Sequence, residues 1–401
     1  MAEGGEMTAR EHMILRPHDY IGSVDKCTRM MWVFEPTNQA STRSSLVHPA
    51  RTYVLGLYKI FDEVLIYAAD NKQRDRSMDS LRVEVDAHQG SISIYYNGQG
   101  LPIELHPEEE GLYMPEMFFG HLQELTGGRS NSYGGVKLAN LFSTEFVIET
   151  VDSRLEKKYK QIFSENMGKK SEPQITVCLQ GVNWTRITFK PDLAKFHMTH
   201  LDDDVIALMG KRVLDMAGLL DVTVQVAFNG TGIRQFDDFM EYAVSYAIAS
   251  SDRYDRLPSR LGQRINDNLG LPEPLKGHPG LRPPLSSVSF VNKFATTEGG
   301  THVDFVSNLI AHRVAQLWDK YLHYQATVDE FKKHLFILVN VVMENPSFNS
   351  PLRDALTSMC QVLVVLIFAV LPSFSFALPL ISTFGAAPRR STCQLRYRLD
   401  N

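Results

Sequence analysis

Two neighbouring segments alternate between apolar and polar residues, and this pattern constrains the fold more than any other feature of the sequence. Residues 81–86 alternate apolar with charged side chains, and residues 91–96 alternate serine or tyrosine with isoleucine or tyrosine. A short turn at residues 88–90 separates the two segments. A period of two is typical of a strand with one buried face. The sequence therefore predicts an antiparallel hairpin with a core on one side.

Helical periodicity flanks this hairpin on both sides. Apolar residues recur at intervals of three and four over residues 57–74 and 202–219, which predicts two long amphipathic helices. A strand is expected at residues 222–228, directly after the second helix. Helices combined with a mostly antiparallel sheet define an α+β fold class.

The composition is that of a folded chain with two domains. The 401 residues are 44% hydrophobic and 22% charged, with a net charge of −5, which excludes a disordered or fibrous chain. Residues 251–284 are rich in Arg, Pro and Gly, which predicts irregular structure. We therefore expect a first domain over residues 1–240 and a smaller α/β domain over residues 241–358. The second domain is expected to hold strands near 288–291 and 335–342 and a helix near 303–324.

The C-terminal residues 359–401 are unusually apolar. The run at residues 362–381 is about as long as a membrane span, although Pro372 and Pro379 interrupt it. The pattern favours a buried or disordered tail, or sequence foreign to the parent protein, over a membrane span. Four distant cysteines and an N-terminus without an apolar leader predict a reducing, intracellular location.

Four side chains of the first predicted helix share one face. At about 100° per residue, Glu63, Tyr67, Asp70 and Asn71 lie within roughly a third of the helix circumference. A carboxylate beside polar groups could act as a general base that activates water. An ordinary solvated face has the same spacing, and the residue pattern by itself favours that second interpretation.

Glycine-rich turns follow the predicted hairpin. They lie at residues 97–100, 126–129 and 133–137, and the last of them opens an apolar run. Backbone N–H groups at a helix N-terminus, beside Arg129 and Lys137, suit a polyphosphate. The turns lack both the Gly-Lys-Ser/Thr ending of a P-loop and the Gly-x-Gly-x-x-Gly fingerprint of dinucleotide-binding proteins.

The order of these features resembles the GHKL ATPases, and longer segments resemble eukaryotic type IIA DNA topoisomerases. The matching segments follow one another in that family's order: EHMILRP (residues 11–17), YIGSV (20–24), GLYKIFDE (56–63), AADNKQRD (68–75), TGGR (126–129), FST (142–144), ITFKPDL (187–193), FVN (290–292), GGTHVD (299–304) and ENPSF (344–348). The last two segments disfavour a histidine kinase or a mismatch-repair ATPase. The resemblance spans residues 11–357.

The resemblance implies an ATP gate, in which a GHKL nucleotide-binding domain with an N-terminal arm precedes a transducer domain. It implies ATP and Mg²⁺ as ligands, Glu63 as the catalytic base, and an expectation that the DNA-cleaving domains are absent from these residues. The ATP-binding residues it implies are Asp70, Asn71, Asn97, Gly98, Gly100, Arg129, Tyr133, Gly134, Gly135, Lys137 and Arg353. It further implies a homodimer, contact with double-stranded DNA and a nuclear location.

Five departures from the family pattern lie at positions that the resemblance places around the nucleotide. Tyr67 stands where the family has a magnesium-binding asparagine, and Tyr96 stands at an adenine-pocket position. The loop between Arg129 and Lys137 is longer than in the family, a preceding Ser-Ser-Asn stretch is missing, and residues 351–353 replace a Gln-Thr-Lys motif. A phenol is a poor neutral ligand for a hard cation. We therefore expect impaired ATP turnover, with a non-catalytic interaction or dimerisation module as the alternative, and whether the chain is an enzyme stays open.

A lysine cluster gives a separate prediction about nucleic acids. Lys157, Lys158, Lys160, Lys169 and Lys170 lie close together in the sequence and could meet the phosphate backbone of DNA. A solvated face is the favoured alternative.

Overall fold

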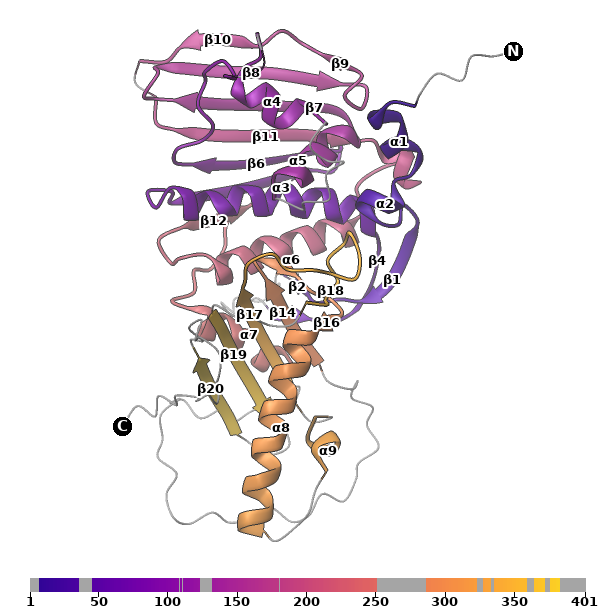
Figure 1. The fold of residues 1–401 in the computed structure, drawn as a ribbon, viewed down its shortest axis with the longest axis vertical. Coiled ribbons are helices and arrows are strands. Elements are labelled where there is room, and N and C mark those ends of the chain that lie inside the picture. Colours follow the sequence, from indigo (N-terminus) through magenta and orange to yellow (C-terminus); the bar gives the residue numbers. More distant parts are fainter. Residues whose placement is uncertain are drawn as a thin grey trace, which may run out of the picture. The chain divides into compact units, whose positions relative to one another are not determined.

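The chain forms two compact units in a computed structural model (Figure 1). The structure describes residues 7–35, 45–107, 109, 111–122, 132–179, 181–250, 286–322, 327–332, 335–358, 364–371 and 376–382. The first unit is Met1–Tyr242 with Ser350–Leu352, and the second is Ala243–Asn349 with Arg353–Asn401. The predicted irregular segment at residues 251–284 lies outside the described residues.

A nine-stranded sheet dominates the first unit. Its strands are β5 (Ser80–Asp86), β6 (Ser91–Asn97), β7 (Ser143–Asp152), β8 (Lys157–Ser164), β9 (Lys169–Lys170), β10 (Gln174–Val177), β11 (Trp184–Pro191), β12 (Gln225–Phe228) and β13 (Thr231–Gly232). They follow the order β10-β8-β7-β11-β6-β5-β12-β13, with β9 beside β8. The pairing is antiparallel except between β12 and β5. The predicted hairpin is confirmed as β5 and β6, in which Val83 lies opposite Ile94.

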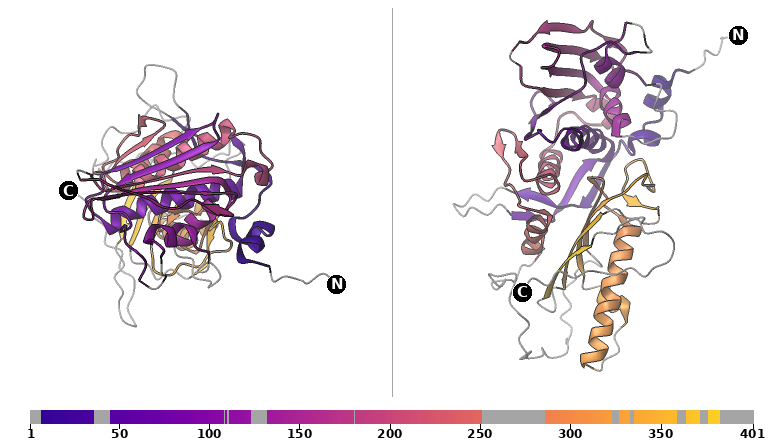
Figure 2. Two further views of the ribbon diagram at one scale, coloured as in Figure 1. Left: turned by 90° about the horizontal axis from the view of Figure 1, so that it is seen from above. Right: turned by 60° about the vertical axis from the view of Figure 1, so that its left-hand side comes forward.

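Helices cover one face of this sheet (Figures 1 and 2). The helices of this part of the chain are α1 (Ala9–Leu15), α2 (His18–Ile21), α3 (Leu55–Arg74), α4 (Met114–Gly120), α5 (Ser132–Leu141), the 3-10 helix η2 (Leu193–Phe196), α6 (Asp203–Leu219) and α7 (Phe239–Ser250). The two predicted long helices are confirmed as α3 and α6. Residues Ile94, Phe146 and Phe189 of the sheet are fully buried beneath the helices, because strand alternation turns them to that side.

Two short antiparallel strand pairs complete the first unit near its N-terminus. Strand β1 (Lys26–Met30) pairs with β4 (Ala50–Val54), and β2 (Val33–Glu35) pairs with β3 (Ser45–Val47). Helix α1 begins with a capping box, in which Thr8 and Glu11 each accept a hydrogen bond from the other's backbone N–H. Reciprocal capping of this kind explains why so short a helix begins where it does.

The second unit is built on a five-stranded sheet. Its strands are β14 (Ser286–Val291), β15 (Phe294–Ala295), β17 (Phe336–Val342), β19 (Val364–Leu371) and β20 (Phe376–Ser382), in the order β15-β14-β17-β19-β20. Helices α8 (Thr301–Leu322) and α9 (Val328–Lys332) and the parallel pair β16 (Gly299–Gly300) and β18 (Ala355–Leu356) complete it. The strands and helix predicted near residues 288–291, 303–324 and 335–342 are confirmed as β14, α8 and β17. Val291, Ile310 and Ile337 belong to its buried core.

The apolar C-terminal run forms two antiparallel strands. Strand β19 pairs with β17 on one side and with β20 on the other. An uninterrupted apolar run is compatible with either a buried strand or a helix, so periodicity could not predict this hairpin. Within the described part of the chain, no helix has the length and apolarity needed to cross a membrane.

Candidate nucleotide site

Helix α3 carries a buried polar face. Glu63, Tyr67 and Asn71 are each at most 2% exposed, and Asp70 is half-buried. The prediction of a solvated face is therefore wrong for Glu63, Tyr67 and Asn71. Their burial follows from tertiary packing, since helices α5 and α6 both lie against α3.

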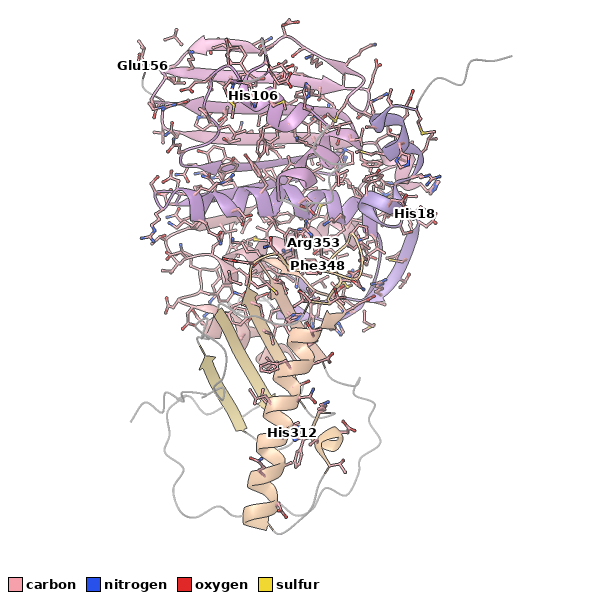
Figure 3. All side chains as sticks on the ribbon, viewed as in Figure 1. His18, His106, Glu156, His312, Phe348 and Arg353 are labelled. Atoms are coloured by element: carbon pink, nitrogen blue, oxygen red, sulfur yellow. The ribbon has the colours of Figure 1, made fainter. Side chains whose placement is uncertain are left out.

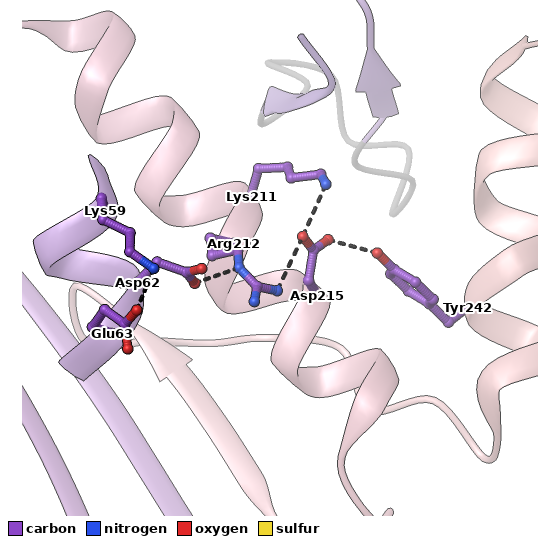
Figure 4. Close-up of polar contacts among 7 residues, drawn as sticks. All are labelled: Lys59, Asp62, Glu63, Lys211, Arg212, Asp215 and Tyr242. Atoms are coloured by element: carbon purple, nitrogen blue, oxygen red, sulfur yellow. Dashed lines mark hydrogen bonds and ion pairs between the residues drawn. The ribbon is translucent and has the colours of Figure 1, made fainter. Parts of the chain in front are cut away.

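The carboxylate of Glu63 forms an ion pair with Lys59, one turn earlier on the same helix (Figure 4). Both side chains are buried. A nearby opposite charge offsets part of the cost of removing a carboxylate from water. Lys59 is not among the predicted site residues, although its spacing of four residues from Glu63 is that of side chains that meet on a helix.

Asp62, the residue before Glu63, anchors helix α3 to helix α6 (Figure 4). Arg212 Nε donates to Asp62 Oδ1 at 2.6 Å, Arg212 Nη1 lies 3.6 Å from Asp215 Oδ2, and the Tyr242 hydroxyl donates to Asp215 Oδ1 at 2.5 Å. Burial by itself lowers the pKa of Arg212, but the charges of Asp62 and Asp215 outweigh burial and raise it. Arg212 therefore stays charged and fixes the turn of α3 that carries Glu63.

Tyr67 lies in a closed aromatic cluster. Its ring centroid is 6.2 Å from Tyr96, 5.4 Å from Phe118 and 5.7 Å from Phe119, and the Arg74 guanidinium carbon lies 4.9 Å from the same centroid. Burial raises the pKa of the Tyr67 phenol well above its usual value, and burial raises the pKa of Tyr96 as well. Both phenols are therefore neutral at physiological pH.

The end of strand β6 brings Asn97 beside helix α3. The Asn97 Oδ1 accepts hydrogen bonds from the backbone N–H groups of Asp79 and Ser80, at 3.0 and 2.8 Å. Asn71 Nδ2 donates to the Asn97 carbonyl oxygen at 3.3 Å. The Asn97 side chain thus links the end of β6 to the start of β5, and the side chain of Asn71 links helix α3 to the end of β6.

Two predicted site glycines allow close approach of the chain to neighbouring side chains. Gly98 has a φ of +91°, and a Cβ there would lie 2.8 Å from Asp75 Oδ2. A Cβ on Gly100 would lie 2.5 Å from Thr185 Oγ1. Only glycine fits both positions without displacement of these neighbours.

Helix α5 brings the last glycine-rich turn, at residues 133–137, onto Glu63. A Cβ on Gly135 would overlap the Glu63 carboxylate, so glycine is required for this contact. Lys137 is buried on the same helix, whereas Gly134 is half-buried. The predicted contacts at Arg129 and at the side chain of Tyr133 lie outside the described residues. Within the predicted phosphate-binding segment, Gly135 thus lies directly beside the carboxylate of Glu63.

Arg353 belongs to the second unit. Its guanidinium carbon lies 3.6 Å from the ring centroid of Phe294 and 6.0 Å from that of Phe348, and the side chain is buried (Figure 3). Stacking on two rings accommodates a buried guanidinium.

Comparison with solved structures identifies the family. The ATPase region of Saccharomyces cerevisiae topoisomerase II matches with a TM-score of 0.73 and 34% identity, over 88% of this chain and 90% of that chain. This chain belongs to the topoisomerase II family. The family described as DNA gyrase B matches residues 284–364. A Thermus thermophilus gyrase B ATPase domain shares the fold, with a TM-score of 0.56 and 21% identity.

Full-length topoisomerases of plants are also similar to this chain. DNA topoisomerase 2 of Arabidopsis thaliana is 47% identical over 86% of the chain, and that of Pisum sativum is 46% identical over 88%. The chain spans about a quarter of the length of these curated relatives, 23% and 24% respectively. It corresponds to the ATPase gate portion of a topoisomerase II, with the GHKL fold that the sequence predicts.

Proposed function

We propose that this chain acts as the ATP gate of a type IIA DNA topoisomerase and that its own ATP turnover is impaired. Closure of the gate as a homodimer would accompany passage of one DNA duplex through another by the full-length enzyme. The similarity to solved ATPase regions supports the gate. The enclosed position of Tyr67 is the observation that supports impaired turnover.

Glu63 is the residue that we assign as general base. Its carboxylate would accept a proton from the water that attacks the γ-phosphate of ATP. The adjacent charge of Lys59 favours the ionised carboxylate. The remaining predicted contacts belong to the same proposal: Asp70, Asn71, Asn97, Gly98, Gly100, Arg129, Tyr133, Gly134, Gly135, Lys137 and Arg353.

Mg²⁺ does not fit the groups around Tyr67. This ion prefers carboxylate, phosphate and water oxygens in near-ideal octahedral geometry. Tyr67 offers a neutral phenol that is enclosed by aromatic rings. We therefore assign no metal ligand at this position, and impaired turnover is the consequence.

A non-catalytic interaction or dimerisation module is the second candidate function. The aromatic cluster of Tyr67 and Tyr96 favours it, since both positions belong to the nucleotide pocket in the family. The fold would then be retained for pairing with another gate, without turnover.

Contact with duplex DNA and a nuclear location are proposed from the family alone. Only part of the charge of the predicted lysine cluster is offset by carboxylates. Lys169 and Lys170 each pair with a glutamate of their own, whereas Lys158 and Lys160 share the single carboxylate of Glu149. The ion pairs of Lys169 and Lys170 leave little of their charge for a duplex backbone. The proposed contact of this portion with duplex DNA is therefore weak or indirect.

The deciding experiment is a calorimetric titration of the 401-residue chain with a non-hydrolysable ATP analogue, with and without Mg²⁺, alongside sedimentation. A micromolar dissociation constant corresponds to a binding free energy of about 8 kcal/mol. We expect the analogue to bind more weakly than this. Micromolar binding with dimer formation would instead identify a fully working gate. A folded sample that neither binds the analogue nor dimerises with it would favour the interaction module.

A further inference from the structure

Strand alternation turns aromatic and basic side chains to the sheet face opposite the helices. Tyr95 on β6 lies opposite Arg82 on β5 and opposite Arg186 on β11. Trp184 precedes Arg186 by two residues on β11, so it faces the same side. These four side chains are exposed or half-buried, whereas the alternate residue Tyr96 is buried among the helices. The outer face thus carries an aromatic pair between basic side chains.

The rings and cations of this face contact one another directly. The centroids of Tyr95 and Trp184 are 5.9 Å apart, and their planes are tilted by 32°. Arg82 lies 5.3 Å from the Tyr95 centroid, and Arg186 lies 5.6 Å from both centroids. Lys158 on β8 lies 5.4 Å from the Trp184 centroid. Four strands, β5, β6, β11 and β8, therefore supply these cations and rings, and β7 lies between the last two.

The positive charge of this face is only partly compensated. Within the described part of the chain, neither Arg82 nor Arg186 forms an ion pair with a carboxylate. Lys158 and Lys160 share a single carboxylate, that of Glu149, at 3.7 and 3.8 Å. The local excess of cations contrasts with the net charge of −5 of the whole chain. The face is therefore complementary to an anionic partner.

A small polar pocket of about 40 Å³ lies between the two arginines. Arg82, Glu84, Ser93, Tyr95 and Arg186 line it. A volume of this size holds roughly three water-sized groups, which is enough for the two unesterified oxygens of one backbone phosphate. The carboxylate of Glu84 repels an anion. The guanidinium groups of Arg82 and Arg186 outnumber this carboxylate, and each can donate two hydrogen bonds to a phosphate.

We propose that this outer sheet face binds single-stranded nucleic acid. Tyr95 and Trp184 form the stacking platform for unpaired bases, and Arg82, Arg186, Lys158 and Lys160 contact the phosphates. Aromatic rings between basic side chains on an open sheet are a recurring way to hold single strands, because every base has a face that can stack. A duplex hides those faces, so it gains only the phosphate contacts.

The experiment measures binding of a fluorescein-labelled oligothymidylate strand to the full chain by anisotropy, without ATP. We expect binding that weakens with salt and that Trp184→Ala weakens roughly tenfold. Trp184→Phe retains the ring and is expected to restore most of the affinity. The double variant Arg82→Gln/Arg186→Gln is expected to reduce the slope of log affinity against log salt by about 1.4.

Lys190→Gln is the matched control. Lys190 lies on the same strand as Trp184 and on the same face, but it pairs with Glu145 at 3.0 Å. Loss of the Lys190 charge is expected to change the affinity for the labelled strand less than twofold. The proposal is overturned if no strand binds at low salt, or if a duplex of equal length binds as well and Trp184→Ala has no effect. Circular dichroism of each variant confirms folding, and the absence of ATP separates this outcome from that of the nucleotide site.

Discussion

Tyr67 is the residue on which the proposed impairment of ATP turnover rests. Polar side chains are its neighbours on helix α3, and Glu63 is buried beside Lys59. The phenol of Tyr67 fills the space next to them with an aromatic ring that packs on Tyr96. Under the proposed function, a bulky phenol thus stands where the family resemblance implies a compact amide ligand.

Substitution Tyr67→Asn is expected to strengthen Mg²⁺-dependent binding of a non-hydrolysable ATP analogue by roughly tenfold, since one regained polar contact contributes about 1.5 kcal/mol. The amide is smaller and offers a carbonyl oxygen to a hard cation. Calorimetric titration of wild type and variant with and without Mg²⁺ measures the change. Tyr53→Phe, a substitution of another buried tyrosine of this unit, is the control. Equal affinities of wild type and Tyr67→Asn would mean that the other departures dominate.

His302 gives the second unit a pH-dependent stability. Burial lowers the pKa of its imidazole to about 4 from 6.5, so the folded state stays neutral where the unfolded state binds a proton. The free energy of unfolding should therefore fall as the pH drops from 6.5 towards 4, by up to about 3 kcal/mol. Denaturant unfolding at several pH values measures this. His302→Gln should flatten the dependence, and an unchanged pH slope in that variant would contradict the assignment.

At the scale of elements, a buried polar network joins helices α3, α6 and α7. Arg212 and Asp215 are fully buried on α6, and they connect Asp62 of α3 with Tyr242 of α7 (Figure 4). Each charge in the network is offset by a partner, so loss of one member leaves another uncompensated away from water. The network thereby holds the helix that carries Glu63 in a single position.

Substitution Arg212→Met is expected to destabilise the first unit by about 3–5 kcal/mol, because Asp62 would remain buried without its ion-pair partner and Asp215 would keep only Lys211. Tyr242→Phe removes one hydroxyl and should cost only about 1 kcal/mol. Chemical denaturation of both variants provides the comparison. Similar losses from the two substitutions would show that the network does not depend on the arginine charge.

At the scale of the whole chain, the C-terminal residues complete the second sheet. Strand β19 covers the edge of β17 over seven paired positions, from Phe336 opposite Val370 to Val342 opposite Val364. An uncovered apolar strand edge is a template for association with another chain. The apolar run after residue 358 is therefore part of the fold of the second unit.

Truncation after Ser358 is expected to lower the melting temperature of the second unit and to promote association. A loss of about 2 kcal/mol would correspond to a shift of roughly 4–8 °C for a unit of this size. Calorimetry and light scattering of the truncated and full chains test this. If the truncated chain melts at the same temperature and stays monomeric, the hairpin of β19 and β20 contributes nothing to stability.

The local elements and the family follow from the order of residues alone. Helix α3 and the hairpin of β5 and β6 follow from periodicities that each segment carries alone, and the ordered motifs identify the topoisomerase II ATPase region. Glu63 was predicted as the base because it lies within such a motif. These inferences need no knowledge of distant contacts.

Which side chains meet in space depends on the packing of distant elements. The ion pair of Arg212 with Asp62 joins residues 150 positions apart, and the closure of Tyr67 depends on Phe118 and Phe119 from another helix. The strand pairing of the apolar C-terminal run is likewise set by its neighbours, since its periodicity is compatible with helix or strand. Burial and electrostatic pairing depend on the packing of separate elements against one another, and no local pattern records that packing.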